Sequence, residues 1–173
     1  MTKPIKSRLR RMIKIVRTYQ ASIEDVWDLW TTKEGIESWW GPEGFSVKVR
    51  TLDLRVNGKL KYAMIAVGED QIQFMKNAGM PLTTEATVAY TDVSPKKRLA
   101  NVHLADFIPG VDPYGVNTLI ELKTIGAKVR MTLSFEAMHN EEWTKRQSMG
   151  WRSEVGKLTK ILKNRAQAKG GKV

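Results

Sequence analysis

The sequence contains no cysteine and only two histidines, His103 and His139, among its 173 residues. The lack of cysteine excludes disulfide bonds, thiol nucleophiles and thiolate metal sites. Two histidines could hold zinc only if carboxylates completed the site. No apolar run approaches the roughly 18 residues of a membrane-spanning helix, and the first residues lack the apolar segment of a secretory signal. We therefore expect a cytoplasmic protein with no metal, no cofactor and no membrane span.

Linkers are missing as well. No segment rich in Pro, Gly or Ser divides the chain, and its length is typical of one domain. We expect a flexible basic arm at residues 1–11, a single domain over residues 12–167 and a flexible basic tail at residues 168–173.

Acidic residues are absent from both ends of a chain whose formal net charge is +11. Residues 1–17 carry seven Lys and Arg, and residues 157–173 carry six. The middle of the chain therefore holds the remaining 16 basic residues together with all 18 acidic residues. The body is therefore close to neutral. The basic ends could bind an acidic partner, nucleic acid or an anionic surface, or they could be solvated arms that contribute little to stability.

The first part of the chain predicts one strand followed by two short helices. Residues 12–19 alternate in polarity, which is typical of a strand. Ser22, with Asp25 three residues later, is typical of a helix N-terminus. The apolar positions that follow predict a short helix up to Trp30, and a second short helix over residues 34–40 ends at Gly41-Pro42.

From Phe45 to Glu136 the pattern is that of strands. We expect a bulge near Arg50 or Thr51, where the parity of the apolar residues changes. Asn57-Gly58 predicts a two-residue hairpin. Residues 71–75 form one turn of helix or an edge segment. The strands are expected at about residues 45–54, 60–67, 83–93, 98–107, 116–124 and 128–136.

The last long segment, residues 140–168, predicts one amphipathic helix. Asn140 can cap its start, and apolar residues recur at helical spacing from Trp143 to Leu162. Gly150 interrupts a good helix sequence, so we expect another segment to approach the backbone there. This helix is the only element large enough to cover the sheet. A sheet curved around one helix leaves a gap, where small apolar ligands bind.

Candidate site residues follow from this arrangement. Two neighbouring indoles on a short helix cannot both point into the core. On the strand over residues 98–107, His103 shares the parity of Leu99 and faces the cavity if Leu99 is buried. Tyr114 belongs to a turn-rich loop at residues 109–115 that could act as a gate. The alternative for each residue is ordinary packing or a stiff connection. The candidates are Trp39, Trp40, Phe45, Met64, Met75, His103, Tyr114, Met131, Phe135, Gly150 and Trp151.

Several segments together resemble a known superfamily. They are residues 21–30, Trp39-Trp40-Gly41-Pro42, residues 53–58, residues 93–99, and Met149-Gly150-Trp151 with Leu158. The chain resembles the SRPBCC (START-like, Bet v-like) superfamily, in the branch of the C-terminal domain of the activator of the heat-shock protein 90 ATPase. The usual double glycine is Asn57-Gly58 here, and the loop at residues 70–81 is longer than in minimal members. The resemblance implies an α+β helix-grip fold, with six to seven antiparallel strands wrapped on a long C-terminal helix and two short helices after the first strand.

The resemblance also implies three functions. The leading prediction is binding of a small hydrophobic molecule, such as a lipid, without catalysis. The second is a protein-interaction module that docks on a chaperone ATPase. The third is an enzyme of the polyketide cyclase or hydratase type, with His103 or Tyr114 as its acid or base. The sequence shows no nucleophile paired with a base and no phosphate-binding glycine loop, so it favours binding over catalysis.

Overall fold

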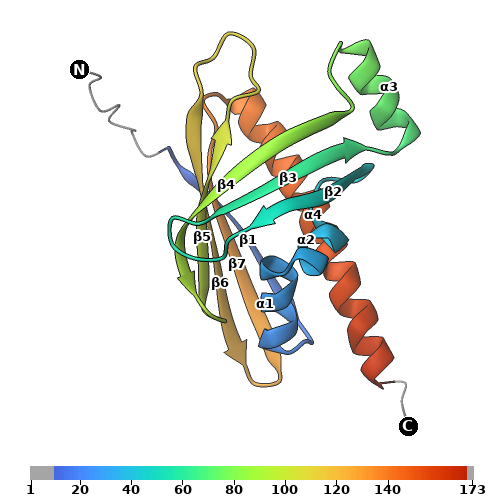
Figure 1. Cartoon of the computed structure of the whole chain (residues 1–173). Helices are drawn as coiled ribbons and strands as arrows, with labels where there is room; N and C mark the ends of the chain where they lie inside the picture. The colour runs from blue at the N-terminus through green and yellow to red at the C-terminus, as the bar shows by residue number, and fades with distance from the viewer. Residues whose placement is uncertain (1–9, 171–173) are drawn as a thin grey trace, which may run out of the picture.

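Seven antiparallel strands form one sheet that curves around the C-terminal helix α4 (Glu141–Gly170). The computed structural model describes residues 10–170, with side chains up to residue 168. The strands lie in the order β1-β7-β6-β5-β4-β3-β2 (Figure 1), which confirms the predicted fold class. Their bounds are β1 Met12–Tyr19, β2 Phe45–Leu52, β3 Lys59–Ala66, β4 Thr83–Ser94, β5 Arg98–Ala105, β6 Tyr114–Ile125 and β7 Lys128–Glu136.

The two short helices predicted after β1 are α1 (Ile23–Thr31) and α2 (Lys33–Trp39). The Ser22 hydroxyl oxygen accepts the Asp25 backbone N–H at 3.1 Å and caps α1. The Thr32 hydroxyl oxygen accepts the Gly35 N–H at 3.0 Å and caps α2. A Cβ on Gly35 would collide with the Asp28 carbonyl oxygen, so glycine permits the tight corner between these helices.

The bulge in β2 is confirmed, since the register with β3 shifts between Val49 and Thr51. The predicted two-residue hairpin is wrong, because six residues, 53–58, connect β2 to β3. Asn57 does take a positive φ of 69°. However, its N–H donates to the Tyr90 carbonyl, and the Tyr90 N–H donates to the Gly58 carbonyl, both at 2.9 Å. The Asn57-Gly58 backbone is therefore hydrogen-bonded to β4 instead of closing a tight β2–β3 turn.

The segment after β3 forms a full helix, α3 (Glu69–Asn77), where the sequence predicted one turn of helix or an edge segment. It projects beyond the ends of β3 and β4 (Figure 1). Its only buried residue is Met75, and its Phe74 is 62% exposed. Helix α3 therefore adds little to the core.

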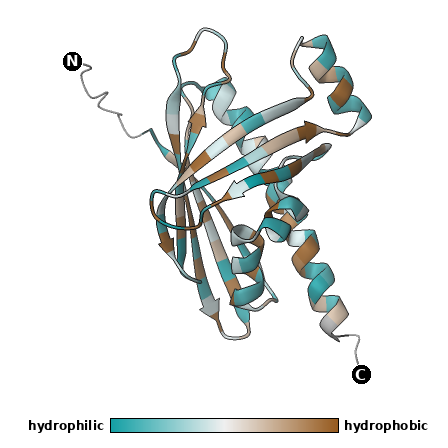
Figure 2. Cartoon of the chain, viewed as in Figure 1, coloured by the Kyte–Doolittle hydropathy of each residue, from teal (hydrophilic) through white to brown (hydrophobic). Residues whose placement is uncertain are grey.

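The core lies between the concave face of the sheet and α4. Apolar and polar residues alternate along the strands (Figure 2), and the inward residues of β7 are fully buried at Met131, Leu133 and Phe135. Helix α4 contributes Val155 and Leu158, which are also fully buried. No helix among residues 10–170 combines the length and apolarity that crossing a membrane requires.

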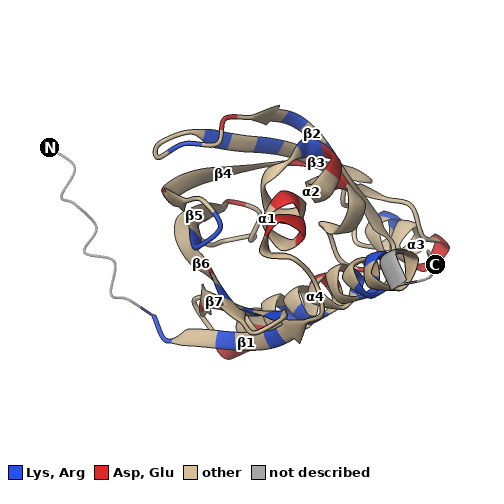
Figure 3. Cartoon of the chain, turned by 90° about the horizontal axis from the view of Figure 1, so that it is seen from below, with Lys and Arg blue, Asp and Glu red and all other residues tan. Residues whose placement is uncertain are grey.

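Parts of both basic ends are bound to the rest of the molecule. Arg10 and Arg11 form ion pairs with Glu136 (2.8 Å) and Glu141 (2.9 Å). Near the other end, the Lys157 Nζ donates to the Gly41 carbonyl at 2.8 Å. Other basic residues lie along β1 and along α4 (Figure 3). Residues 1–9 and 171–173, which hold much of the predicted arm and tail, lie outside the described residues.

Candidate functional site

A cavity of about 310 Å³ lies between α4 and the concave face of the sheet. Three successive turns of α4 form one wall, from Trp143 to Glu154, and strands β3 to β6 form the other. At about 1.5 Å rise per residue, the helical wall is roughly 16 Å long. The lining residues are Trp143, Arg146, Gln147, Gly150, Trp151 and Glu154 from α4, Tyr62, Met64, Val88, Asn101, His103, Ala105, Val116 and Thr118 from the strands, and Trp40, Pro42, Phe107 and Met138 from the connections.

Aromatic rings line the cavity next to α2. The rings of Trp40 and Trp151 lie with their centroids 6.1 Å apart, and the Trp40 and Tyr62 centroids are 6.0 Å apart. Trp39 is fully buried, and its indole N–H donates to the Leu29 carbonyl at 2.7 Å. Both neighbouring indoles are buried in one cluster, with ring centroids 5.2 Å apart, so the expectation that they cannot both point into the core is wrong. Trp40 also lines the cavity, and Trp39 does not.

Gly150 has a different role from the one that its position predicts. A Cβ placed on Gly150 would meet no atom within 4 Å, so the expected close approach of another segment is wrong. Gly150 lines the cavity instead. The missing side chain leaves open volume at the middle of the helical wall.

Polar side chains from β5 and β6 lie on the sheet side of the cavity. Leu99 is buried, and Asn101, His103 and Ala105 share its side of β5 and line the cavity, as their parity predicts. Thr118 is the register partner of Asn101 on β6. Burial lowers the pKa of His103, and the nearby Asp106 opposes this effect. His103 is therefore neutral at pH 7, with one ring nitrogen as donor and the other as acceptor.

Glu154 is the acidic member of the helical wall. One of its carboxylate oxygens accepts the Gly41 backbone N–H at 2.8 Å, and Lys157 holds the Gly41 carbonyl. The Ser153 hydroxyl oxygen accepts the Glu43 N–H at 2.9 Å. Helix α4 thus fastens the segment that follows α2. Burial raises the pKa of Glu154 to about 7, although the Gly41 N–H and the charge of Lys157 both act to lower it.

We expect Glu154→Gln to gain stability relative to the unsubstituted protein as the pH rises from 5 to 8. The pKa of Glu154 is about 7 in the folded state against an ordinary 4.5. The favourable contribution of its protonated form is therefore complete below pH 4.5 and is lost as the pH rises through 7. Between pH 5 and pH 8, the free energy of unfolding of the unsubstituted protein therefore falls by roughly 2 to 3 kcal/mol relative to that of the Gln variant. Gln keeps an acceptor for Gly41 and carries no charge. Urea unfolding at both pH values measures this, and an equal effect of the substitution at pH 5 and pH 8 would contradict it.

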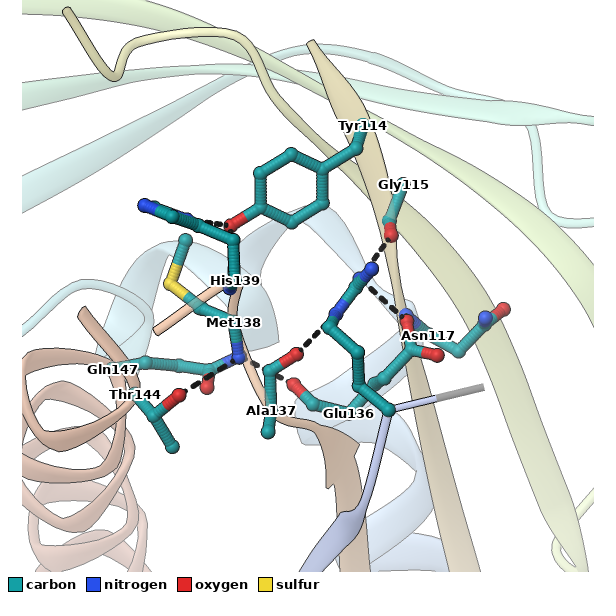
Figure 4. A network of polar contacts seen from close by, with 10 residues as sticks. Tyr114, Gly115, Asn117, Glu136, Ala137, Met138, His139, Thr144 and Gln147 are labelled. Carbon is teal, nitrogen blue, oxygen red and sulfur yellow. Dashed lines mark hydrogen bonds and ion pairs between the residues drawn. The ribbon is translucent and has the colours of Figure 1, made fainter. Parts of the chain in front are cut away.

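Tyr114 lies outside the cavity lining, in a polar network at the start of α4 (Figure 4). Its hydroxyl accepts the His139 backbone N–H at 3.2 Å and lies 2.7 Å from the His139 Nδ1. The guanidinium of Arg10 stacks on the Tyr114 ring, 4.6 Å from its centroid. Tyr114 is therefore held by structural contacts and is not among the residues that line the cavity.

Arg10 is the centre of this network. It donates to the Ala137 carbonyl at 2.6 Å, to the Gly115 carbonyl at 2.8 Å and to the Glu136 carboxylate at 2.8 Å. The Glu136 side chain is only 3% exposed. The backbone carbonyl of Glu136 accepts the Gln147 side-chain N–H at 3.0 Å. The network therefore connects the N-terminal segment, β6, β7 and the cavity-lining face of α4.

The structure brings five of the eleven predicted site residues together in the cavity, namely Trp40, Met64, His103, Gly150 and Trp151. Three others lie in the packed core, namely Trp39, Met131 and Phe135. The last three lie elsewhere, namely Phe45 at the start of β2, Met75 on α3 and Tyr114 in the network of Arg10.

The sequence prediction missed four polar or charged lining residues, Thr118, Arg146, Gln147 and Glu154. Glu154 follows Trp151 by three residues on the helical stripe, so it interrupts a face that is otherwise apolar. A carboxylate on an otherwise apolar helix face was the available signal that Glu154 belongs to a site. Thr118 shares the parity of the apolar Val116 and Ile120 on its strand, so the alternation was the available signal for its inward position.

The curved antiparallel sheet, the long helix across it and the cavity between them define a helix-grip protein of the α+β class. A family model described as "Activator of Hsp90 ATPase homolog 1-like protein" matches residues 20–163. The chain therefore belongs to this family, which confirms the resemblance seen in the sequence.

Solved structures share the fold. A protein from Chromobacterium violaceum superposes with a TM-score of 0.72 at 21% identity, over 87% of this chain and 96% of that one. An AHSA1 protein from Silicibacter pomeroyi superposes with a TM-score of 0.69 at 17% identity, over 90% of this chain and 99% of that one. A search of curated proteins found no match. At these identities the likeness establishes the architecture and leaves the function to be argued from the site.

Proposed function

We propose that this chain binds a small, mainly apolar molecule in the cavity between the sheet and α4, without chemical conversion of it. The observation that carries the proposal is the open volume opposite Gly150, bordered by the rings of Trp40 and Trp151. Cavities of about 300 Å³ are at the small end of ligand sites. At about 30 Å³ for each water-sized volume, this one suits a ligand of roughly ten to fifteen non-hydrogen atoms.

Catalysis receives less support from the geometry. Of His103 and Tyr114, the two candidates for an acid or base, only His103 lines the cavity, and the Tyr114 hydroxyl is engaged with His139. The Glu154 carboxylate has a pKa suited to proton exchange near pH 7. However, it is engaged with the Gly41 N–H and so serves to hold the cavity wall.

The test of binding is Gly150→Leu, compared with Gly156→Leu on the same helix. Both positions have free space around a Cβ, and both variants gain about 0.8 to 1 kcal/mol of helix propensity. Only position 150 lines the cavity. We therefore expect both variants to remain folded, and Gly150→Leu alone to weaken binding at least tenfold.

Naphthalene is a suitable probe, since it would quench indole fluorescence and raise the melting temperature. At a free concentration of ten times Kd, mass action adds about 1.4 kcal/mol to stability, or roughly 3 to 6 °C for a domain of this size. Equal loss of binding in both variants would remove the cavity as the site. A panel of apolar compounds that all leave the melting temperature unchanged would contradict the proposal itself.

A second candidate function follows from the family, whose description names an activator of the Hsp90 ATPase. In that case the domain surface would dock on a chaperone ATPase, with the basic ends in contact with an acidic part of it. The discriminating measurement is the ATPase rate of such a chaperone with and without this protein. Stimulation that Gly150→Leu leaves intact would favour docking over ligand binding. A cytoplasmic location, which both functions assume, stays a prediction.

A further inference from the structure

The sheet side of the cavity holds polar groups that the protein itself does not satisfy. Asn101 and Thr118 are each only 5% exposed, and they lie opposite each other on β5 and β6. Among residues 10–170, neither side chain has a hydrogen-bond partner, nor has the ring of His103, two positions further along β5. Among the described residues, the buried side-chain atoms without a partner are Trp30 Nε1 and Gln147 Oε1, so the polar atoms of Asn101, Thr118 and His103 face the open cavity instead of being enclosed by protein. Water or a ligand in the cavity has to supply their hydrogen bonds.

These three side chains carry no charge. The charged lining groups are Arg146 and Glu154, and both come from α4. Arg146 already pairs with Glu142 at 2.9 Å and lies 5.0 Å from the centre of the Trp143 ring. An anion placed against β5 and β6 would thus lack a cationic partner on that wall, and it would share the cavity with the Glu154 carboxyl group.

The hydrogen-bonding capacity of the β5 and β6 wall further restricts which ligand group can bind there. The Asn101 amide offers two N–H donors and a carbonyl acceptor, and the Thr118 hydroxyl offers one donor and an acceptor. A carboxylate can only accept, so it would leave the Asn101 carbonyl without a donor. A carboxamide can form two reciprocal hydrogen bonds with Asn101, and a hydroxyl can donate and accept in the same way.

We propose that Asn101, Thr118 and His103 form a subsite for an uncharged group that both donates and accepts hydrogen bonds, so that the ligand is a small apolar body carrying a carboxamide or hydroxyl group. This inference rests on the proposed binding function and specifies the ligand class. The apolar body lies against Trp40, Trp151 and the open side of Gly150, and the polar group faces β5 and β6.

The test uses three probes with one ring system: 2-methylnaphthalene, 2-naphthamide and 2-naphthoate. The last two differ only in a neutral amide against a carboxylate. Calorimetry with the full chain should show 2-naphthamide binding at least tenfold more tightly than 2-naphthoate. Thr118→Val, which keeps the shape of the side chain, should weaken 2-naphthamide about two- to tenfold. Asn101→Leu should weaken it at least tenfold. Neither variant should change 2-methylnaphthalene binding by more than twofold.

Both variants should also keep the melting temperature within a few degrees, because neither side chain has a hydrogen-bond partner in the described part of the chain and both face the open cavity. Equal losses for 2-naphthamide and 2-methylnaphthalene would show a packing effect and overturn the subsite. Tighter binding of 2-naphthoate that Arg146→Gln abolishes would overturn it in favour of a carboxylate held near Trp143. If none of the three probes binds, the proposed function fails and the subsite fails with it. Should Asn101→Leu not fold, Thr118→Val decides the test alone.

Discussion

A fragment that ends at residue 140 will not fold. Helix α4 is the large element that covers the concave face of the sheet, and its Val155, Leu158 and Leu162 are at most 2% exposed. Without it, the fully buried Met131, Leu133 and Phe135 of β7 would face water. Complete burial of such a side chain is worth about 1.5–3 kcal/mol, so exposing these three costs roughly 5–9 kcal/mol, which is comparable with the whole stability of a typical domain, about 5–15 kcal/mol.

The measurement is thermal unfolding followed by circular dichroism, with a chain that ends at residue 167 as the control. That control keeps Leu162, the last buried residue of α4, and should melt cooperatively within a few degrees of the full chain. A cooperative transition in the fragment of residues 1–140 would show that the sheet is stable without its cover.

Arg10→Leu should destabilise the protein by about 3 kcal/mol, although its position near the N-terminus resembles a solvated arm. The substitution leaves the Glu136 carboxylate, whose side chain is 3% exposed, without its cation. It also leaves the carbonyls of Ala137 and Gly115 without a donor. Breaking a buried pair by removing one partner costs roughly 3–5 kcal/mol, and the 24% exposure of Arg10 favours the lower part of that range. The melting temperature should fall by about 6 to 12 °C.

Arg11→Leu is the matched control, since Arg11 pairs with Glu141 at a similar distance but both side chains are more than half exposed. It should cost less than about 1 kcal/mol. Replacing both Arg10 and Glu136 with Leu should recover part of the loss, because no buried charge then remains unpaired. Equal effects of the Arg10 and Arg11 substitutions would show that the network around Arg10 does not stabilise the fold.

The sequence predicts the elements well because their signals are local. The alternation over residues 128–136 specified β7, and the Asn140 side chain does accept the Trp143 N–H at 2.9 Å at the start of α4. The failures depend on distant partners. Asn57-Gly58 has the local signature of a hairpin, but its backbone pairs with Tyr90. Likewise, no local pattern marks Arg10 as the partner of Glu136, 126 residues away.

The candidate site was predicted in part for the same reason. Side-chain parity on β5 correctly placed His103 toward the cavity once Leu99 was buried. A glycine inside a helix, however, is compatible with close packing and with open space alike. Only the position of the sheet relative to Gly150 decides between them.

The pairing of β1 with β7 sets the order in which the molecule can be completed during synthesis. Met12 lies opposite Glu136 and Tyr19 opposite Val129, so β1 cannot pair until β7, more than 100 residues later, has been synthesised. Strands β2 to β7 can pair as they emerge, because each is hydrogen-bonded to a strand that is next to it in the chain. Closing so long a loop is slow. Until β7 and α4 have emerged, the apolar side of β1, including Ile15 and Tyr19, stays without its final cover.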